Sequence, residues 1–315
     1  MNNKGSVLGS ILWIVLAVLI IFLAYEIYQN APGELIDFNV VLPEDGAALE
    51  NATDTLEMFY PNMRFVSNNL SFGFTGECTP DKKERVYEAF NIIATETKIL
   101  SFKESLANPK IVIFCSEVEK ETTENTYIAG EGGPEKVLNS TLYPIIGGGR
   151  VYLYGTKKES NCEYPVVEIH ELMHVFGFNH IKNKSSILYP YLDCEQKLDV
   201  EIIDELRRLY SIEPKAELKI KEANVSKSGV YLNFDIKIEN IGLIDAKNNV
   251  LRIKTSSSSL IKDFELDDIE PGTTQTLKVQ NLKLPSRNTD GVVIEIITET
   301  KEFYPENNIL TAKLD

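Results

Sequence analysis

The chain has 315 residues, of which 43% are hydrophobic and 25% charged, and its formal net charge is -15 at pH 7. This length is enough for two domains and a further segment, and the composition is that of a folded protein. The acidic balance argues against nucleic-acid binding, because phosphate contacts need clustered Lys and Arg side chains, which we do not find.

The first predicted element is a membrane anchor at residues 7–25, which contain no charged side chain. Nineteen helical residues at about 1.5 Å each nearly span a hydrocarbon core of about 30 Å. Lys4 precedes this run and Glu26 follows it, so the positive-inside rule predicts a cytoplasmic tail at residues 1–6 and an extracellular remainder. A cleaved signal peptide is the alternative, although the run is longer than a typical signal core and no clear cleavage site follows it.

Residues 26–61 are predicted to be a stalk or linker, or an N-terminal arm. They mix Asn, Ala, Pro, Gly and acidic residues with one short apolar run at residues 38–42.

The segment 62–213 is predicted to be a folded domain that begins as an α/β sheet. The pattern from Met63 to Phe74 favours a strand, and Lys110 to Cys115 reads as a buried strand. Between them, Thr79 and Pro80 open a helix with a side-chain cap and a proline in the first turn. A strand, a helix and a strand of these lengths form a right-handed parallel crossover. The apolar face of the helix is formed by Val86, Ala89, Phe90 and Ile93.

Further β segments are expected at residues 127–129 and 150–154, and a group of glycines follows the first of them. Gly130, Gly132 and Gly133 could suggest a phosphate loop. No helix beginning with Lys-Ser or Lys-Thr follows, so we expect these glycines to form turns.

The strongest signal in the chain is residues 170–180, which read H-E-x-x-H-x-x-G-x-x-H and contain all three histidines. On a helix, His170 and His174 project from one face about one turn apart, close enough to hold one metal ion. Gly177 lets the chain leave the helix, and this turn can bring His180 back as a third ligand. Three imidazoles leave a fourth position for water, as in a catalytic zinc site.

Glu171 lies next to the first of these ligands and is the candidate general base for that water. Two other interpretations remain open: histidines that only pack or hydrogen-bond, and a site that binds metal without turnover. Three histidines suit zinc, although nickel, cobalt or copper could occupy the same ligands.

Residues 170–180 resemble the zinc signature of the metzincin metallopeptidases, and their surroundings resemble the matrixin-like branch. In that family a turn containing methionine runs beneath the metal, with a proline about ten residues after the third ligand. Residues 186–190, Ser-Ile-Leu-Tyr-Pro, fall at that spacing, with Leu188 at the methionine position and Pro190 at the proline position. An aliphatic leucine should keep this support of the site apolar.

The resemblance covers roughly Met63 to Ile212, including a zinc helix and a closing helix capped by Asp199. It implies an α+β catalytic domain with a mixed, mostly parallel sheet, one catalytic Zn²⁺ per chain and protein or peptide substrates. It also implies an antiparallel edge strand that pairs with the extended substrate, which we expect within Leu142 to Tyr154. Many matrixins bind structural Ca²⁺, but no calcium ligand is identified here. Matrixin latency by a cysteine switch has no counterpart, because residues 26–61 contain no cysteine.

Cys78, Cys115, Cys162 and Cys194 all lie in this domain, and an even count outside the cell favours two disulfides. Cys78 and Cys115 follow two strands that we expect to be adjacent and parallel, so these two cysteines should be near each other. Cys162 and Cys194 would then form the second pair, although four cysteines allow three pairings. Thiolate zinc ligands are the alternative, but no C-x-x-C spacing supports them.

Residues 214–315 are predicted to be an all-β sandwich of about seven strands. Apolar and polar residues alternate over 230–239, and short strands recur every ten to fifteen residues. The turn segments at 239–242, 270–273 and 306–308 resemble the CARDB-like, immunoglobulin-type domains of prokaryotic surface proteins. A cell-surface ligand for this domain is consistent with that resemblance.

The sequence therefore predicts a single-pass, membrane-anchored zinc endopeptidase with a cytoplasmic N-terminus, extracellular domains and no nucleic-acid partner. Two alternatives stay open: a surface adhesion or binding protein with a vestigial metal site, and a strict processing enzyme for one partner at the same membrane. The intact Glu171 counts against the vestigial site, because a lapsed peptidase is expected to lose its base first.

Overall fold

The computed structural model describes residues 13–23, 35–37, 52–121, 127–139, 142–155 and 162–314. Residues 13–23 are helical, whereas the remainder of the expected anchor and the expected tail at 1–6 lie outside the described residues. Within the described residues, no helix is both long and apolar enough to cross a membrane.

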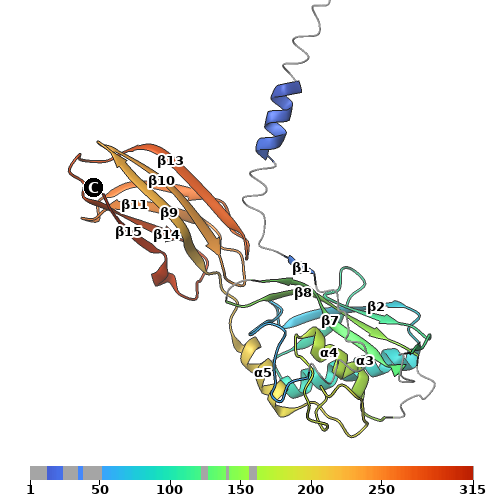
Figure 1. Cartoon of the computed structure of the whole chain (residues 1–315). Coiled ribbons are helices and arrows are strands. Elements are labelled where there is room, and N and C mark those ends of the chain that lie inside the picture. The colour runs from blue at the N-terminus through green and yellow to red at the C-terminus, as the bar shows by residue number, and fades with distance from the viewer. Residues whose placement is uncertain are drawn as a thin grey trace, which may run out of the picture. The chain divides into compact units, whose positions relative to one another are not determined.

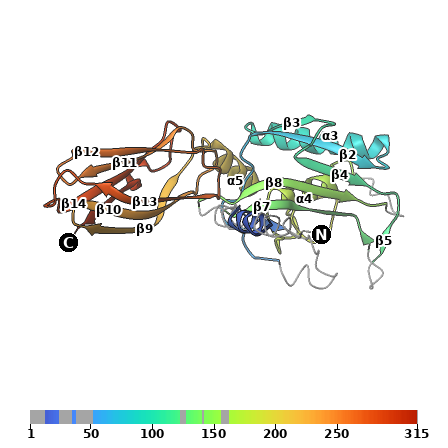
Figure 2. The same ribbon diagram turned by 90° about the horizontal axis from the view of Figure 1, so that it is seen from above.

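Glu34–Pro214 form one compact unit that contains a six-stranded mixed sheet (Figures 1 and 2). Its strands are β1 (Leu35–Asp37), β2 (Asn69–Gly76), β3 (Ser101–Glu104), β4 (Ile111–Cys115), β7 (Gly130–Leu138) and β8 (Ile145–Leu153). The strand order is β1-β7-β8-β4-β2-β3. The pairs among β3, β2, β4 and β8 are parallel, whereas β7 is antiparallel to both β8 and β1. A separate small ladder pairs β5 (Lys120–Glu121) with β6 (Tyr127–Ile128).

The residues expected to form a stalk contribute to this unit where the structure describes them. Residues 35–37 form β1, and residues 52–60 run along residues 177–181, which contain the third histidine. The Thr53 N–H donates to the carbonyl oxygen of His180 at 3.1 Å, and the Phe59 N–H donates to that of Gly177 at 2.8 Å.

Three helices belong to the described part of this unit: α3 (Pro80–Thr97), α4 (Val166–Val175) and α5 (Val200–Ser211). Helix α3 begins where the sequence predicts, because the Thr79 hydroxyl accepts a hydrogen bond from the Lys82 N–H at 3.4 Å. Helices α3 and α4 lie on the same face of the sheet (Figure 1). Nearly every residue of α4 is buried, which is typical of a helix covered on all sides. The zinc motif therefore begins inside the core.

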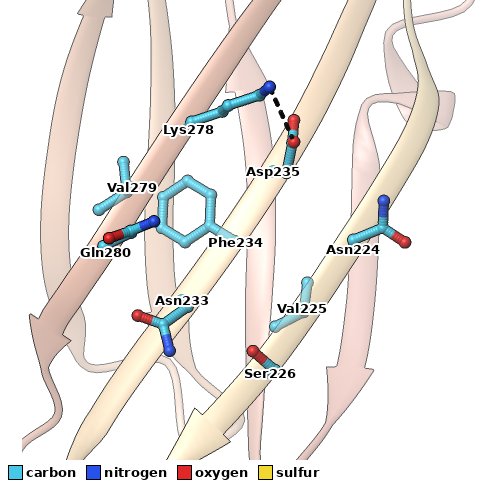
Figure 3. A pocket seen from close by; sticks show the side chains of 9 residues that line it. All are labelled: Asn224, Val225, Ser226, Asn233, Phe234, Asp235, Lys278, Val279 and Gln280. Atoms are coloured by element: carbon cyan, nitrogen blue, oxygen red, sulfur yellow. Dashed lines mark ion pairs between the residues drawn. The ribbon is translucent and has the colours of Figure 1, made fainter.

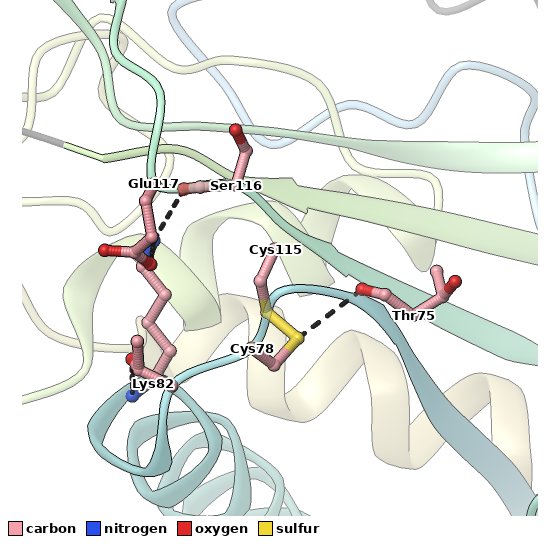
Figure 4. Close-up of a disulfide and its surroundings, with 7 residues drawn as sticks. Thr75, Cys78, Lys82, Cys115, Ser116 and Glu117 are labelled. Atoms are coloured by element: carbon pink, nitrogen blue, oxygen red, sulfur yellow. Dashed lines mark hydrogen bonds and ion pairs between the residues drawn. A yellow bond between two sulfur atoms is a disulfide. The ribbon is translucent and has the colours of Figure 1, made fainter.

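Both disulfides join segments that border this sheet and α4. Cys78 follows β2 and Cys115 ends the adjacent parallel strand β4, and their Cα atoms are 4.8 Å apart (Figure 4). Cys162 precedes α4 and is bonded to Cys194 before α5, with a Cα separation of 5.1 Å. This is the pairing expected from the order of the strands.

The expectation that the antiparallel, substrate-binding edge strand lies within Leu142 to Tyr154 is wrong. Strand β8 lies inside the sheet, parallel to β4 and antiparallel to β7, so the antiparallel strand is β7 itself. Gly130, Gly132 and Gly133 form part of β7 and not turns. Glycine in a strand marks a place where another part of the chain comes close, and here that part is α4.

Replacing Arg64 by methionine is expected to lower the free energy of unfolding by about 2 kcal/mol. Arg64 is fully buried, and its guanidinium donates to the carbonyl oxygens of Phe65, Leu209 and Ile212. Leu209 and Ile212 lie at the C-terminal end of α5, where carbonyl groups lack helical partners. Methionine fills much of the volume but leaves these acceptors without their donor. Urea denaturation of the purified chain measures the loss.

The matched control is Arg208→Met on α5, the helix whose C-terminal end Arg64 contacts. The Arg208 guanidinium pairs with Glu205 and Asn62 at the surface, and such pairs contribute about 0.5 kcal/mol or less. Equal effects of the two substitutions would contradict the role assigned to Arg64.

Lys215–Asp315 fall in a second compact unit, whose described residues form seven strands in two antiparallel sheets. One sheet has the order β13-β10-β9 and the other β12-β11-β14-β15. The alternation predicted for residues 230–239 is confirmed, because Leu232, Phe234, Ile236 and Ile238 are buried in one core with residues of the other sheet. The elements are β9 (Leu218–Ser228), β10 (Tyr231–Asn240), β11 (Asn249–Thr255), β12 (Leu260–Leu266), β13 (Thr274–Lys283), β14 (Gly291–Ile297), a 3₁₀ turn (Pro305–Asn307) and β15 (Ile309–Lys313).

Candidate active site

Helix α4 and the turn after it bring the three histidines together. His170 and His174 lie one turn apart on α4, and the chain turns at Gly177, whose φ is 93°. The Nε2 atom of His174 lies 3.0 Å from that of His170 and 3.1 Å from that of His180. The Nε2 atoms of His170 and His180 are 3.3 Å apart. A Cβ at position 177 would lie 2.3 Å from the sulfur of Met63, so glycine is required by both the space and the backbone.

The hydrogen bonds of the Nδ1 atoms determine which ring nitrogen carries the proton. His170 Nδ1 lies 2.6 Å from the carbonyl oxygen of Ile187, and His174 Nδ1 lies 2.8 Å from that of Phe178. A carbonyl oxygen only accepts, so each Nδ1 carries the hydrogen and each neutral ring presents a lone pair at Nε2. Two buried lone pairs at 3.0 Å repel each other unless a cation lies between them. The arrangement therefore fits a metal site better than a hydrogen-bonded core cluster.

Zinc fits this set of donors in both spacing and chemistry. Tetrahedral coordination with Zn–N bonds of about 2.0–2.1 Å places the nitrogens roughly 3.4 Å apart, close to the separations found here. The Nδ1 contacts to carbonyl oxygens are those that usually orient histidine ligands. In the part of the chain that the structure describes, these histidines form the one group of His, Cys, Asp and Glu side chains placed to share a metal ion. His170, His174 and His180 would hold the ion.

Acidification of the metal-free protein is expected to lower its free energy of unfolding between pH 6.5 and about pH 4. Burial lowers the pKa of His174 from 6.5 to about 4, and burial together with His174 lowers that of His180 to about 3. The unfolded chain therefore binds more protons in this window, so the stability is complete above pH 6.5 and is lost as the pH falls. For His174 alone the loss is on the order of 3 kcal/mol.

Urea unfolding after chelation, repeated at successive pH values, measures this loss. The variant His174→Gln, which cannot titrate, should show a flatter pH dependence over the same range. An unchanged slope in that variant would contradict the assignment to His174.

Glu171 lies beneath the glycines of β7. A Cβ at Gly130 would lie 2.7 Å from Cγ and 2.9 Å from Oε1 of Glu171. A Cβ at Gly132 would lie 2.2 Å from the backbone oxygen of Glu171. The glycines therefore let the backbone of β7 pack directly on the helix that carries the ligands. Burial, with the negative charges of Glu131 and Glu168, raises the pKa of Glu171 well above its usual range.

The turn at residues 186–190 supports the first ligand through its backbone. The Ile187 carbonyl oxygen accepts the hydrogen bond from His170 Nδ1, and Leu188 is fully buried in the core. Pro190 is half-buried. The Asp199 carboxylate accepts hydrogen bonds from the Ser186 hydroxyl at 2.8 Å and the Ile187 N–H at 3.1 Å.

Asp199 therefore differs in role from the helix cap that the sequence suggests. It occupies the N-cap position of α5, but its side chain makes no capping hydrogen bond there. It holds the turn at residues 186–190 instead, and through Ile187 it supports His170. No local pattern in the sequence indicates this role, because it depends on a contact between two separate segments.

The chain is similar to known proteins in two regions. Residues 65–211 match the family model described as matrixin. No curated protein matches the chain significantly. Among solved structures, the CARDB domain of a Pyrococcus furiosus protein, determined in complex with di-metal ions, is 14% identical with a TM-score of 0.26. That match covers 32% of this chain and 88% of the other.

A domain of a Methanosarcina acetivorans protein, solved by NMR, is also 14% identical with a TM-score of 0.26, covering 31% of this chain and 90% of the other. Both likenesses fall on the C-terminal part of the chain. The family match instead falls on the unit that carries the three histidines, and it ends at the last residue of α5. The segment 65–211 is therefore similar to the matrixin family.

Proposed function

We propose that this chain is a membrane-anchored, extracellular zinc endopeptidase. The observation that carries the proposal is the convergence of three histidine Nε2 atoms, 3.0–3.3 Å apart, within the matrixin-type segment. Glu171 follows the first of these histidines and lies against β7. The substrates are proteins or peptides, as the family implies.

Glu171 is the general base and acid of the proposed reaction. Zinc at such a site supplies Lewis-acid polarisation of a carbonyl group and acidifies water. The Glu171 carboxylate accepts a proton from the attacking water and delivers it to the leaving amine. Its buried position excludes bulk water, and a dication at the histidines opposes the effect of burial on its pKa.

Strand β7 is the proposed substrate-binding strand. Within the described residues, positions 130–134 pair only with β8 and Glu135 lies at a bulge in that ladder, so the other edge of this segment offers backbone groups to an extended peptide. An added strand binds through its backbone, which makes recognition tolerant of sequence. The edge ends at Gly130, beside Glu171, so a bound peptide would pass the general base.

The proposed anchor and location rest on sequence. Residues 7–25 contain no charge and are flanked by Lys4 and Glu26, which supports an anchor with its N-terminus in the cytoplasm. Two disulfides in the peptidase unit support an oxidising compartment. Protease protection of the chain in sealed vesicles of known orientation tests both points.

The activity is tested with a quenched fluorescent peptide library and the purified full chain. We expect cleavage that requires about one zinc per chain, that stops after chelation and that returns when zinc is added. Zinc content is measured on the same samples. A chain that holds zinc but cleaves no member of a broad library would refute general endopeptidase activity.

A second candidate function, binding of a cell-surface ligand by the sandwich, is favoured by one observation. A depression of about 310 Å³ lies over the three strands β9, β10 and β13 (Figure 3). An ion pair between Lys278 and Asp235, 3.5 Å long, borders it. The polar residues that line the depression are Asn224, Ser226, Asn233, Asp235, Lys278 and Gln280.

Binding of the Glu171→Gln chain to cell-envelope material, and loss of that binding in Asp235→Ala, would support this function.

A further inference from the structure

We infer that strand β1 is a built-in stop on the substrate-binding edge of β7, which limits how many substrate residues fit on the N-terminal side of the cleaved bond. The inference rests on the proposed peptidase function. Its basis is that β1, a segment of the chain's own N-terminal region, pairs antiparallel with the last three residues of β7.

The backbone register of β1 fixes which part of β7 it covers. Leu35 is opposite Leu138, Ile36 is opposite Val137, and Asp37 is opposite Lys136. Strand β1 therefore lies beside residues 136–138, at the end of β7 that is farther from Gly130.

The two ends of β7 have different surroundings. Gly130 and Gly132, at its start, lie against Glu171. Residues 136–138, at its end, are covered by β1. Between Gly132 and β1, residues 132–135 provide roughly four positions, or about 14 Å at 3.4 Å per residue. A peptide that adds to this edge beside Glu171 therefore meets β1 after about four residues.

The direction of the peptide decides which of its ends is limited. We place the substrate antiparallel to β7, in the same orientation as β1, so its N-terminal side points towards the C-terminal end of β7. That end is the one occupied by β1. Strand β1 also runs antiparallel to β7, so it occupies the positions that a longer substrate would use. A substrate with more than about four residues before the cleaved bond must therefore displace β1, or its additional residues must leave the edge of β7.

The segment that follows β1 is attached again beside the metal site. The Thr53 N–H donates to the His180 carbonyl oxygen at 3.1 Å, and the Asn179 N–H donates to that of Glu57 at 2.9 Å. The N-terminal region thus contacts the peptidase unit at both β7 and the turn that carries the third histidine. Displacing β1 therefore cannot release the whole region.

The first experiment tests the position of β1 without using activity. The pair Asp37→Cys and Lys136→Cys is introduced into the full chain, where the backbones of register partners are close enough for a disulfide. Peptide mapping should find this crosslink beside the two native disulfides. The control pair, Leu35→Cys with Lys136→Cys, should not form it, because these residues are two positions out of register and their Cα atoms are expected to lie farther apart than the roughly 7 Å that a disulfide spans. Absence of the 37–136 crosslink would overturn the inference.

The second experiment measures cleavage of peptides with two, four or eight residues before the cleaved bond. In the wild-type chain kcat/KM should fall about tenfold between four and eight residues. The triple variant Leu35→Pro, Ile36→Pro and Asp37→Pro, which lacks the backbone donors of β1, should lose this penalty. The matching triple alanine variant keeps those donors and should retain it.

The outcomes separate this inference from the proposed function. Cleavage that does not depend on the length of the N-terminal side would reject the stop and leave the peptidase intact. Zinc binding without cleavage of any peptide would reject the proposed peptidase function. It would also reject the role of β1 as a stop, even if the crosslink forms.

Discussion

Replacing Glu171 by glutamine is expected to lower kcat/KM for peptide cleavage by at least about a hundredfold while zinc remains bound. The amide has nearly the same shape as the carboxylate but cannot accept the proton of the attacking water. The metal should stay, because the proposed ligands are the Nε2 atoms of His170, His174 and His180. Peptide cleavage and zinc content, measured on the same preparation, test both parts of this expectation.

The control for this substitution is Glu201→Gln, which makes the same chemical change at an exposed position in the first turn of α5. Its kcat/KM should equal that of the wild type. Full activity of Glu171→Gln would remove Glu171 from the mechanism. Loss of zinc from that variant would instead show that Glu171 contributes to the metal site and not only to proton transfer.

The site could be predicted because its ligands are close in sequence. Helix geometry places His170 and His174 on one face, and a glycine turn returns His180, so the group needs few contacts from elsewhere. The start of α3 and the alternation in β10 were predictable for the same reason, since each depends on neighbours along the chain. Local periodicity therefore indicated these elements and the metal site.

The features that could not be predicted depend on contacts between distant segments. Asp199 supports a turn more than ten residues earlier, although its local pattern is that of a helix cap. Strand β3 is short and largely exposed, so its composition carries little of the alternation that marks a strand. Residues 52–60 follow the turn after α4 through backbone hydrogen bonds, and these do not depend on side-chain type. Composition alone left a stalk and an N-terminal arm both open there.

The glycines of β7 show how a local rule can predict the wrong element. Glycine is depleted in strands and common in turns, so Gly130, Gly132 and Gly133 predict turns when only neighbouring residues are considered. The structure places them in a strand because the backbone of Glu171 comes too close for a side chain. Without the fold, the sequence does not reveal that a residue about forty positions later occupies this space.

Replacing Gly132 by alanine is therefore expected to lower the free energy of unfolding by at least about 3 kcal/mol and to reduce peptide cleavage. The new Cβ would lie 2.2 Å from the backbone oxygen of Glu171 and 2.8 Å from its Cα atom. Neither atom belongs to a flexible side chain, so β7 or α4 must shift. A shift of α4 moves both Glu171 and the histidines next to it. Urea denaturation and peptide cleavage, measured on the metal-loaded chain, quantify the two effects.

Gly148→Ala is the matched control, because Gly148 lies in the neighbouring strand β8 and has room beside its Cα atom for a methyl group. A Cβ there would have ordinary contacts, 3.5 Å to the Lys110 carbonyl oxygen and 3.9 Å to a carboxylate oxygen of Glu135. Alanine at this position should leave stability within about 1 kcal/mol and cleavage nearly unchanged. If the two alanine variants behaved alike, the close approach of β7 to α4 would not be what requires glycine. If only Gly132→Ala lost stability and activity, the strand and the proton acceptor would form one packed unit.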